Sequence, residues 1–431
     1  MPKQDVIDRT RGFLKKNLET MPLKKRNEYL NQKLRGIIQY AYKHSSAIKN
    51  KLDSAGLKPK DIRSVKDLER LPITKKAELV ELQKKNPPFG GFEGIPINQM
   101  RRIYVSPGPI LEPGEMEYTE LGWAQGMYAG GFRPGDIAIN TFSYHMVPFA
   151  LHMVDNSLRR VGCIIIPMGV GNTEQQVHVL RNLKANGFCG TPSFLLTIAE
   201  KAEEIGFDPK KDLNLRVGFV AAEMLPESLR SKLEDKFGMI IRQSYGTADI
   251  GCLGYECLEK NGMHIPDDKI LEIGDPESGK QLGPGKVGEI VATSFNKVYP
   301  LIRFGTGDLS MVTTDRCPCG RTSPRLVKIM GRVDQVTKVR GLFVHPGQVD
   351  EVASKHPQMA RVQVVVTRRG DKDEMTFRVE LKEEIFQPEK LKEEIERSVR
   401  DIMKVRGEVQ FVPRGTIPEG AKKIEDQRKW E

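Results

Sequence analysis

The chain has 431 residues, of which 39% are hydrophobic and 29% are charged, and it carries a net charge of +11. This composition is typical of a soluble globular protein with two or three domains. The sequence shows no signal peptide and no apolar stretch near the roughly 18 residues of a membrane span. We therefore expect a cytoplasmic protein without a membrane partner. It also lacks a basic stripe interleaved with aromatic residues, which argues against a nucleic-acid partner.

Residues 1–85 are predicted to be mostly helical. Leu34, Ile38 and Ala41 recur at helical spacing, and prolines separate the helices of this region. Residues 86–102 are rich in Pro, Gly and Asn and are predicted to form a loop.

The middle of the chain alternates short apolar runs with helical patterns, which predicts an α/β fold with parallel βαβ units. The strands are expected at 163–167, 188–191, 217–221 and 239–242. The helices are expected at 173–186, from 193 onward, and at 226–237. The run 163–167 is apolar enough to predict a buried strand, and the segment after 287 is more purely β.

A boundary is expected near the segment Gly-Arg-Val-Asp at 331–334, which divides the chain into domains 1–332 and 333–431. The second domain has an ordinary size for a small α+β unit. Its strands are expected at 362–367, 375–381 and 409–412, and its helix at 388–403. The last residues, 419–431, are polar and are expected to be mobile.

Four short motifs carry candidate chemistry. The segment 244–249, Ser-Tyr-Gly-Thr-Ala-Asp, follows a strand. There the Thr247 hydroxyl and backbone N–H groups could hold phosphate and Asp249 could hold Mg²⁺. The plain alternative is a strand and turn with an exposed acid. The segment 304–309, Phe-Gly-Thr-Gly-Asp-Leu, suits a carboxylate that accepts two ribose hydroxyls, although many turns look like this.

The other two motifs lie at the boundary and near the C-terminus. Arg332 can reach phosphate or ribose, while the residues around it flex as a hinge or simply form a surface turn. Lys422 lies on a loop containing glycine, where it could neutralise a developing negative charge. Taken alone, it is more often a solvated surface lysine.

In this order and at these distances, the four motifs resemble the adenylate-forming superfamily, and specifically the phenylacetate–CoA ligase family. Further segments agree: Gly-Thr-Pro-Ser at 190–193, Ala-Ala-Glu at 221–223, and Cys-Pro-Cys-Gly-Arg-Thr at 317–322. The resemblance spans roughly residues 25–431. It implies a large adenylation domain and a small mobile C-terminal domain. It also implies two steps: an acyl-adenylate forms from ATP, and the acyl group then passes to coenzyme A.

The resemblance also implies residue roles. Tyr245 would stack on adenine, Asp308 would bind the ribose, and Asp334 would be the hinge. The catalytic residues would be Lys422, Asp249 (with magnesium) and Thr247. The nucleotide-binding residues would be Ser106, Gly108, Ala222, Glu223, Ser244, Tyr245, Gly246, Thr247, Asp308 and Arg332. Coenzyme A would enter near Lys338 and Gly341, and Tyr144, His145 and Gly190 would shape the acyl pocket. An aromatic lining suits an aryl acid such as phenylacetate.

This chain departs from the family in its phosphate loop. The family loop is rich in Ser, Thr and Gly and ends in Gly-Lys, whereas residues 106–113 here read Ser-Pro-Gly-Pro-Ile-Leu-Glu-Pro. The loop is stiffer and has no lysine. The spacing near Lys422 is altered, so that Lys423 is an alternative. Two further functions therefore stay open: an adenylating enzyme with an acceptor other than CoA, and a nucleotide-binding homologue without turnover.

Cysteine and histidine spacing predicts a metal site. Cys257 and His264 form Cys-x6-His, and Cys317 and Cys319 form a distant Cys-x-Cys. Three thiolates and one imidazole suit a closed, tetrahedral structural zinc, whereas free buried cysteines are the alternative. Cys252 is a spare ligand. The expected small-molecule partners are thus a carboxylic acid, ATP, Mg²⁺ and coenzyme A, and a homodimer is left open.

Overall fold

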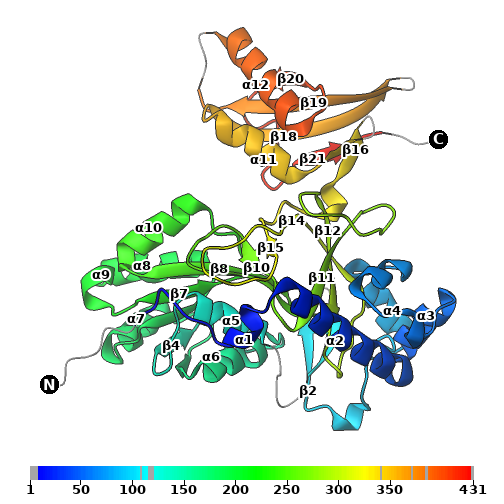
Figure 1. Cartoon of the computed structure of the whole chain (residues 1–431). Helices are drawn as coiled ribbons and strands as arrows, with labels where there is room; N and C mark the ends of the chain where they lie inside the picture. The colour runs from blue at the N-terminus through cyan, green and yellow to red at the C-terminus, as the bar shows by residue number, and fades with distance from the viewer. Residues whose placement is uncertain are drawn as a thin grey trace. The chain divides into compact units, whose positions relative to one another are not determined.

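The computed structural model describes residues 8–106, 109–114, 121–339, 342–369, 372–383 and 387–428. Contacts between Cα atoms divide the chain into two compact units. The first unit comprises Met1–Thr306 and Met311–Lys328, and the second comprises Gly307–Ser310 and Ile329–Glu431 (Figure 1). The domain boundary after Arg332 stays a prediction. Among the described residues, no helix is both long enough and apolar enough to cross a membrane.

The described part of residues 1–85 is mostly helical, as the apolar periodicity predicts. Its α-helices are α1 (Lys16–Glu19), α2 (Leu23–His44), α3 (Ser46–Ser54) and α4 (Leu79–Lys85). Helix α2 buries Leu34, Ile38 and Ala41. It ends at His44, and the next residue, Ser45, caps α3 by accepting a hydrogen bond from the Ile48 N–H at its hydroxyl.

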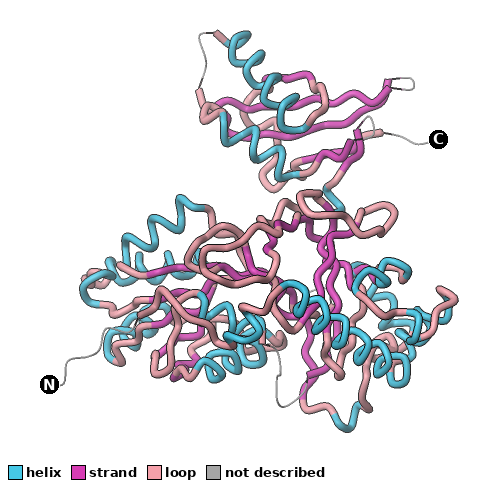
Figure 2. The backbone as a smooth tube through the Cα atoms, viewed as in Figure 1, coloured by secondary structure: helices cyan, strands magenta, loops and turns pink. Residues whose placement is uncertain are grey.

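A nine-stranded sheet forms the centre of the first unit, in the order β14-β15-β10-β9-β8-β7-β6-β4-β5. Five strands from β5 to β8 run parallel, which confirms the predicted βαβ pattern. These strands are β4 (Ile137–Asn140), β5 (Ile164–Pro167), β6 (Gly187–Gly190), β7 (Val217–Val220) and β8 (Ile240–Thr247). The helices of this region are α5 (Gly122–Ala129), α6 (Asn156–Val161), α7 (Thr173–Asn182), α8 (Pro192–Glu204), α9 (Pro209–Asp212) and α10 (Glu227–Phe237) (Figure 2).

The strand predicted at 163–167 is present as β5, but the prediction that it is buried is wrong. Strand β5 lies at the edge of the sheet and pairs only with β4 among the described strands. Ile164 is 57% exposed. A run of isoleucines gives the same apolar signal at an edge as in the middle of a sheet, so the pattern located the strand but not its neighbours.

Further strands complete the first unit, and they are antiparallel apart from the parallel pair of β1 and β13. The large sheet continues through β9 (Gly251–Glu256), β10 (Met263–His264), β15 (Arg325–Leu326) and β14 (Val312–Thr313). A second sheet has the order β1 (Thr74–Lys75), β13 (Phe304–Ser310), β12 (Gly288–Ser294) and β11 (Lys269–Gly274). Strands β2 (Arg102–Ser106) and β3 (Ile110–Gly114) form a separate two-stranded ladder.

The second unit is the expected small α+β fold. Its four-stranded sheet has the order β20-β19-β18-β21. The elements are β16 (Thr337–Val339), β17 (Leu342–Val344), α11 (Pro346–Lys355), β18 (Met359–Arg369), β19 (Lys372–Leu381), α12 (Pro388–Met403), β20 (Glu408–Phe411) and β21 (Ile424–Asp426). The expectation of a mobile tail is wrong at 424–426, because Ile424 is buried and β21 pairs in parallel with β18.

Candidate active site

The turn after β8 holds the first motif at the carboxyl end of the parallel sheet, where open α/β sheets bind ligands. Ser244 to Thr247 belong to β8, and Asp249 lies in the turn before β9. Gly246 is required there, because an added Cβ would lie 2.3 Å from the Gly251 carbonyl oxygen and 2.8 Å from the Trp123 ring. The Tyr245 hydroxyl lies 3.3 Å from the Thr306 hydroxyl, which ties the motif to β13.

Asp249 is buried, so the alternative of a strand and turn with an exposed acid is wrong on this point. Its side chain is 0% exposed, and its Oδ2 atom accepts a hydrogen bond of 2.7 Å from Lys76 Nζ. Lys76 comes from a 3-10 helix at Lys76–Glu78 in the N-terminal region. Lys76 was not predicted, since one lysine in a charged segment carries no pattern that links it to a residue 173 positions away.

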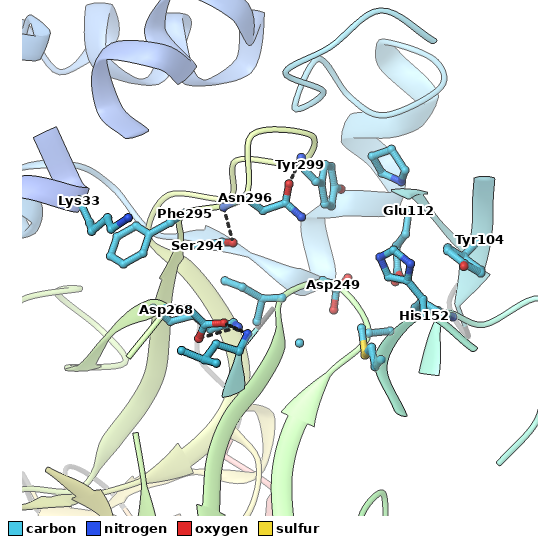
Figure 3. Close-up of a pocket in the computed structure, with 18 of the residues that line it drawn as sticks. Lys33, Tyr104, Glu112, His152, Asp249, Asp268, Ser294, Phe295, Asn296 and Tyr299 are labelled. Atoms are coloured by element: carbon cyan, nitrogen blue, oxygen red, sulfur yellow. Dashed lines mark hydrogen bonds and ion pairs between the residues drawn. The ribbon is translucent and has the colours of Figure 1, made fainter. Parts of the chain in front are cut away.

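A cavity of about 340 Å³ lies against this turn (Figure 3). The residues that line it include Tyr104, Glu112, His152, Asp249, Asp268 and Tyr299. Glu112 is 4% exposed, and the Ser106 hydroxyl lies beside its carboxylate. Burial, and then the charge of Asp249, raise the pKa of Glu112 to about 8. Glu112 lies in the segment that was predicted to be a phosphate loop, but it was not predicted as a site residue.

The predicted acyl-pocket residues lie elsewhere among the described residues. Tyr144, His145 and Gly190 do not line the 340 Å³ cavity. The Tyr144 hydroxyl donates to Asp155 at 3.0 Å, and His145 is exposed. Gly190 is packed so closely that an added Cβ would lie 2.1 Å from the Thr141 hydroxyl. Their role in an acyl pocket stays a prediction.

His152 does line the cavity. It is buried in the π-helix Phe149–Asp155 and packs against the Tyr104 ring with 5.5 Å between centroids. Burial, and then the charge of Arg102, lower the pKa of His152 to about 4. The imidazole is therefore neutral at physiological pH.

Within the second unit, the structure brings three predicted nucleotide and hinge residues together. Arg332 Nη1 donates to Asp308 Oδ1 at 2.9 Å, and Arg332 Nε lies 3.6 Å from Asp334 Oδ1. Gly307 has a φ of +78°, and an added Cβ would lie 2.7 Å from an Arg332 nitrogen. The close approach of the guanidinium explains the glycine of this Gly-Asp turn.

The remaining nucleotide-binding candidates are placed as follows. Ser106 is buried at the end of β2. Ala222 adopts a positive φ of 69°, and Glu223 accepts a hydrogen bond of 2.8 Å from the Ser193 hydroxyl. Gly108 lies outside the described residues.

Of the candidates in the second unit, Gly341 lies outside the described residues. Lys338 belongs to β16, and its side chain is not described. Lys422 is exposed, and its carbonyl oxygen accepts a hydrogen bond of 3.1 Å from Gln363. Lys423 forms an ion pair with Asp350. Its ammonium is therefore engaged, which favours Lys422 as the more available of the two.

The predicted metal ligands form a compact group. One ligand atom from each of Cys257, His264, Cys317 and Cys319 lies within 4.8 Å of all the others. The Sγ atoms of Cys257 and Cys317 are 3.7 Å apart, and Cys319 Sγ lies 3.4 Å from His264 Nε2. Tetrahedral zinc with ordinary bond lengths requires roughly 3.8 Å between two sulfurs and roughly 3.5 Å between sulfur and nitrogen.

The surroundings of this group also fit zinc. The other ring nitrogen of His264, Nδ1, lies 3.2 Å from the Ser323 hydroxyl, which can fix the imidazole with Nε2 free for a metal. A hydrogen bond from Cys257 and the nearby His264 lower the pKa of the Cys319 thiol, which favours a thiolate. Cys252 is buried outside the group.

Comparison with known proteins agrees with this geometry. Residues 122–296 match the family of AMP-binding enzymes, and residues 341–428 match the AMP-binding enzyme C-terminal domain. The class of protein is therefore that of the AMP-binding enzymes. The structure of an open conformation of 2-hydroxyisobutyryl-CoA ligase, in complex with 2-HIB-AMP and CoA, superposes with a TM-score of 0.86 at 26% identity. That match covers 95% of this chain and 93% of the other.

Curated relatives define the family more closely. The phenylacetate-coenzyme A ligase of Thermus thermophilus is 32% identical over 96% of this chain and 99% of its own length. The enzyme of the same name from Escherichia coli is 30% identical over 93% and 94%. The chain belongs to the phenylacetate–CoA ligase family.

Proposed function

We propose that this protein is an AMP-forming acid–CoA ligase whose substrate is an aromatic acid such as phenylacetate. The observation that carries the proposal is the turn after β8. It places buried Asp249 beside a cavity at the carboxyl end of the parallel sheet, in a chain of the phenylacetate–CoA ligase family. Ligands of open α/β sheets bind at this edge.

The proposed reaction has two balanced steps. The carboxylate oxygen of the acid attacks the α-phosphorus of ATP, and pyrophosphate leaves with the bonding electrons. The thiol of CoA then loses its proton, its sulfur attacks the carbonyl carbon of the acyl-adenylate, and AMP leaves. Lys422 provides positive charge where negative charge develops in the first step.

The proposed binding roles follow the family resemblance. Asp308 and Arg332 hold the ribose, Tyr245 stacks on the adenine, and the Thr247 hydroxyl holds phosphate. Asp249 offers a carboxylate oxygen to Mg²⁺, a hard ion that prefers oxygen ligands. The bound ion would supply charge neutralisation at the phosphates.

We also propose one structural zinc ion at Cys257, His264, Cys317 and Cys319. The interatomic distances, the burial and the Ser323 contact support this assignment. The zinc would connect strands β9 and β10 to the segment after β14, so that its role is scaffolding and not catalysis. The cytoplasmic location, a homodimer and the exclusion of nucleic acid stay predictions.

A screen of aromatic acids for ATP-dependent CoA thioester formation tests the function. Pyrophosphate release is measured separately for each acid, with and without CoA. We expect at least one aromatic acid to give both pyrophosphate and a CoA thioester. Acid-dependent pyrophosphate release with no thioester would favour transfer to another acceptor. Nucleotide binding with no acid-dependent pyrophosphate release would contradict the ligase function.

A further inference from the structure

The loop that carries Lys422 is held at both of its ends within the second unit. At its start, the backbone N–H of Ile417 donates to Glu380 Oε1 at 2.6 Å. The carbonyl oxygen of the same residue accepts a hydrogen bond of 3.0 Å from Arg361 Nη1. The Ile417 side chain is buried as well. Both backbone groups and the side chain of Ile417 are therefore fixed.

The pairing of β18 with β19 explains why these two groups meet one residue. Arg361 of β18 stands directly opposite Glu380 of β19 in the antiparallel register, so their side chains lie on the same face of the sheet. Gln363 is two residues beyond Arg361 and shares that face. Val364 has the other orientation and packs in the core with α11 and α12. The loop therefore binds to the face that the two helices leave open.

The far end of the loop is fixed by three further contacts. The Lys422 carbonyl oxygen accepts a hydrogen bond of 3.1 Å from the Gln363 side chain, which is itself buried. The Lys423 carbonyl oxygen accepts one of 2.8 Å from the Val364 N–H. The ammonium group of Lys423 pairs with Asp350. This ion pair is exposed and contributes little, so the two hydrogen bonds are the main anchors at this end.

Residues 418–421 span the gap between the two anchored ends. The Ala421 N–H donates to the Pro418 carbonyl oxygen at 3.1 Å, which closes a turn, and Gly420 supplies a φ of +77° within it. Lys422 follows directly, and its side chain is exposed. A charged group stabilises a transition state most when its position is set before the reaction begins. The anchored loop meets that condition for the backbone of Lys422.

We propose that Arg361, Glu380 and Gln363 are positioning residues for the adenylation step. Their hydrogen bonds fix the backbone of the loop, so that the ammonium group of Lys422 is presented from one place. This inference rests on the proposed function of Lys422. It adds a task for three residues that lie on two strands, 42 or more positions before the lysine in the chain.

Hydrogen–deuterium exchange of the protein without ligands tests the anchoring by itself. We expect the peptide 417–423 to exchange at least about tenfold faster in Arg361→Met, Glu380→Leu and Gln363→Leu, because each variant removes one anchor and permits local opening. Glu380→Gln keeps an oxygen that can accept the Ile417 N–H and should restore the protection. Thermal unfolding of each variant checks that it is folded.

Arg414→Met is the matched control. The Arg414 guanidinium also donates to a backbone carbonyl oxygen, that of Leu381, at 2.9 Å. The control therefore loses the same charge and the same kind of hydrogen bond as Arg361→Met, while Ile417 keeps both of its partners. Exchange of the peptide 417–423 should stay at the wild-type rate.

A double-mutant cycle tests whether the anchors act through Lys422. Arg361→Met should lower kcat for acid-dependent pyrophosphate release by about tenfold, with KM for ATP and for the acid unchanged, because the lysine acts in the transition state. In the Lys422→Ala background, the same substitution should have no further effect. Thioester formation from supplied acyl-adenylate should keep its wild-type rate.

Equal exchange in the wild type and the three anchor variants would overturn the anchoring. A full tenfold loss from Arg361→Met in the Lys422→Ala background, or equal slowing by Arg414→Met, would overturn the positioning role, since either result indicates a general effect on the second unit. Wild-type protein without acid-dependent pyrophosphate release would contradict the proposed function and the positioning role with it. The exchange experiment contains no substrate and would still decide the anchoring.

Discussion

Replacing Cys319 by serine removes one of the four side chains that we propose to hold zinc. Loss of the metal opens the link between Cys257 and Cys317, which are 60 residues apart in the chain. Treated as a cross-link, closure of a 60-residue loop stabilises the folded state by about 4 kcal/mol. The first unit contains roughly 320 residues, and its unfolding entropy scales with that length.

These two quantities give the expected change in melting temperature. An unfolding entropy of about 0.7 kcal/mol per kelvin converts the loss of 4 kcal/mol into a fall in Tm of about 6 °C. The measurements are elemental analysis of protein purified without added metal, and calorimetry. We expect one zinc per chain in the wild type, much less in Cys319→Ser, and a similar fall in Tm when the wild type is treated with a chelator.

Cys163→Ser is the matched control. Cys163 is buried outside the metal group, and its thiol donates to the Arg133 carbonyl oxygen at 3.6 Å. This variant should keep one zinc. Wild-type protein with less than about half an equivalent of zinc, and with an unchanged Tm after chelation, would refute the argument.

Three further perturbations test other parts of the molecule. Lys422→Ala should slow adenylation by on the order of 10²-fold, as expected for loss of one electrostatic group. It should leave thioester formation from supplied acyl-adenylate nearly unchanged, and equal slowing of both half-reactions would contradict the role. Gly246→Ala should destabilise the protein by about 1–3 kcal/mol in denaturant unfolding, because its Cβ overlaps the Gly251 carbonyl oxygen; an unchanged midpoint would argue against this packing. His152 has a pKa lowered to about 4. Between pH 6.5 and 4 the unfolded state therefore binds a proton that the folded state does not, and stability falls as the pH falls. His152→Gln should make that slope shallower, whereas parallel curves would mean that His152 does not contribute.

The sequence predicted the elements that depend on local periodicity. The parallel strands from β5 to β8 and the helix α12 follow from apolar spacing, which burial in a sheet or on one helix face imposes directly, whereas β4 was not predicted. The metal group was also predictable, because cysteine and histidine at such spacing are chemically specific. The exposure of β5 and the pairing of residues 424–426 as strand β21 could not be predicted, since both depend on which strand lies alongside.

The ion pair and the carboxylates of the cavity show why a site is harder to predict than a fold. Asp249 belongs to a recognisable motif, but Lys76 reaches it from 173 residues earlier and Glu112 faces it from a different strand ladder. None of these residue types is unusual at its own position. Their chemistry arises from shared burial, which raises the pKa of the Glu112 carboxyl.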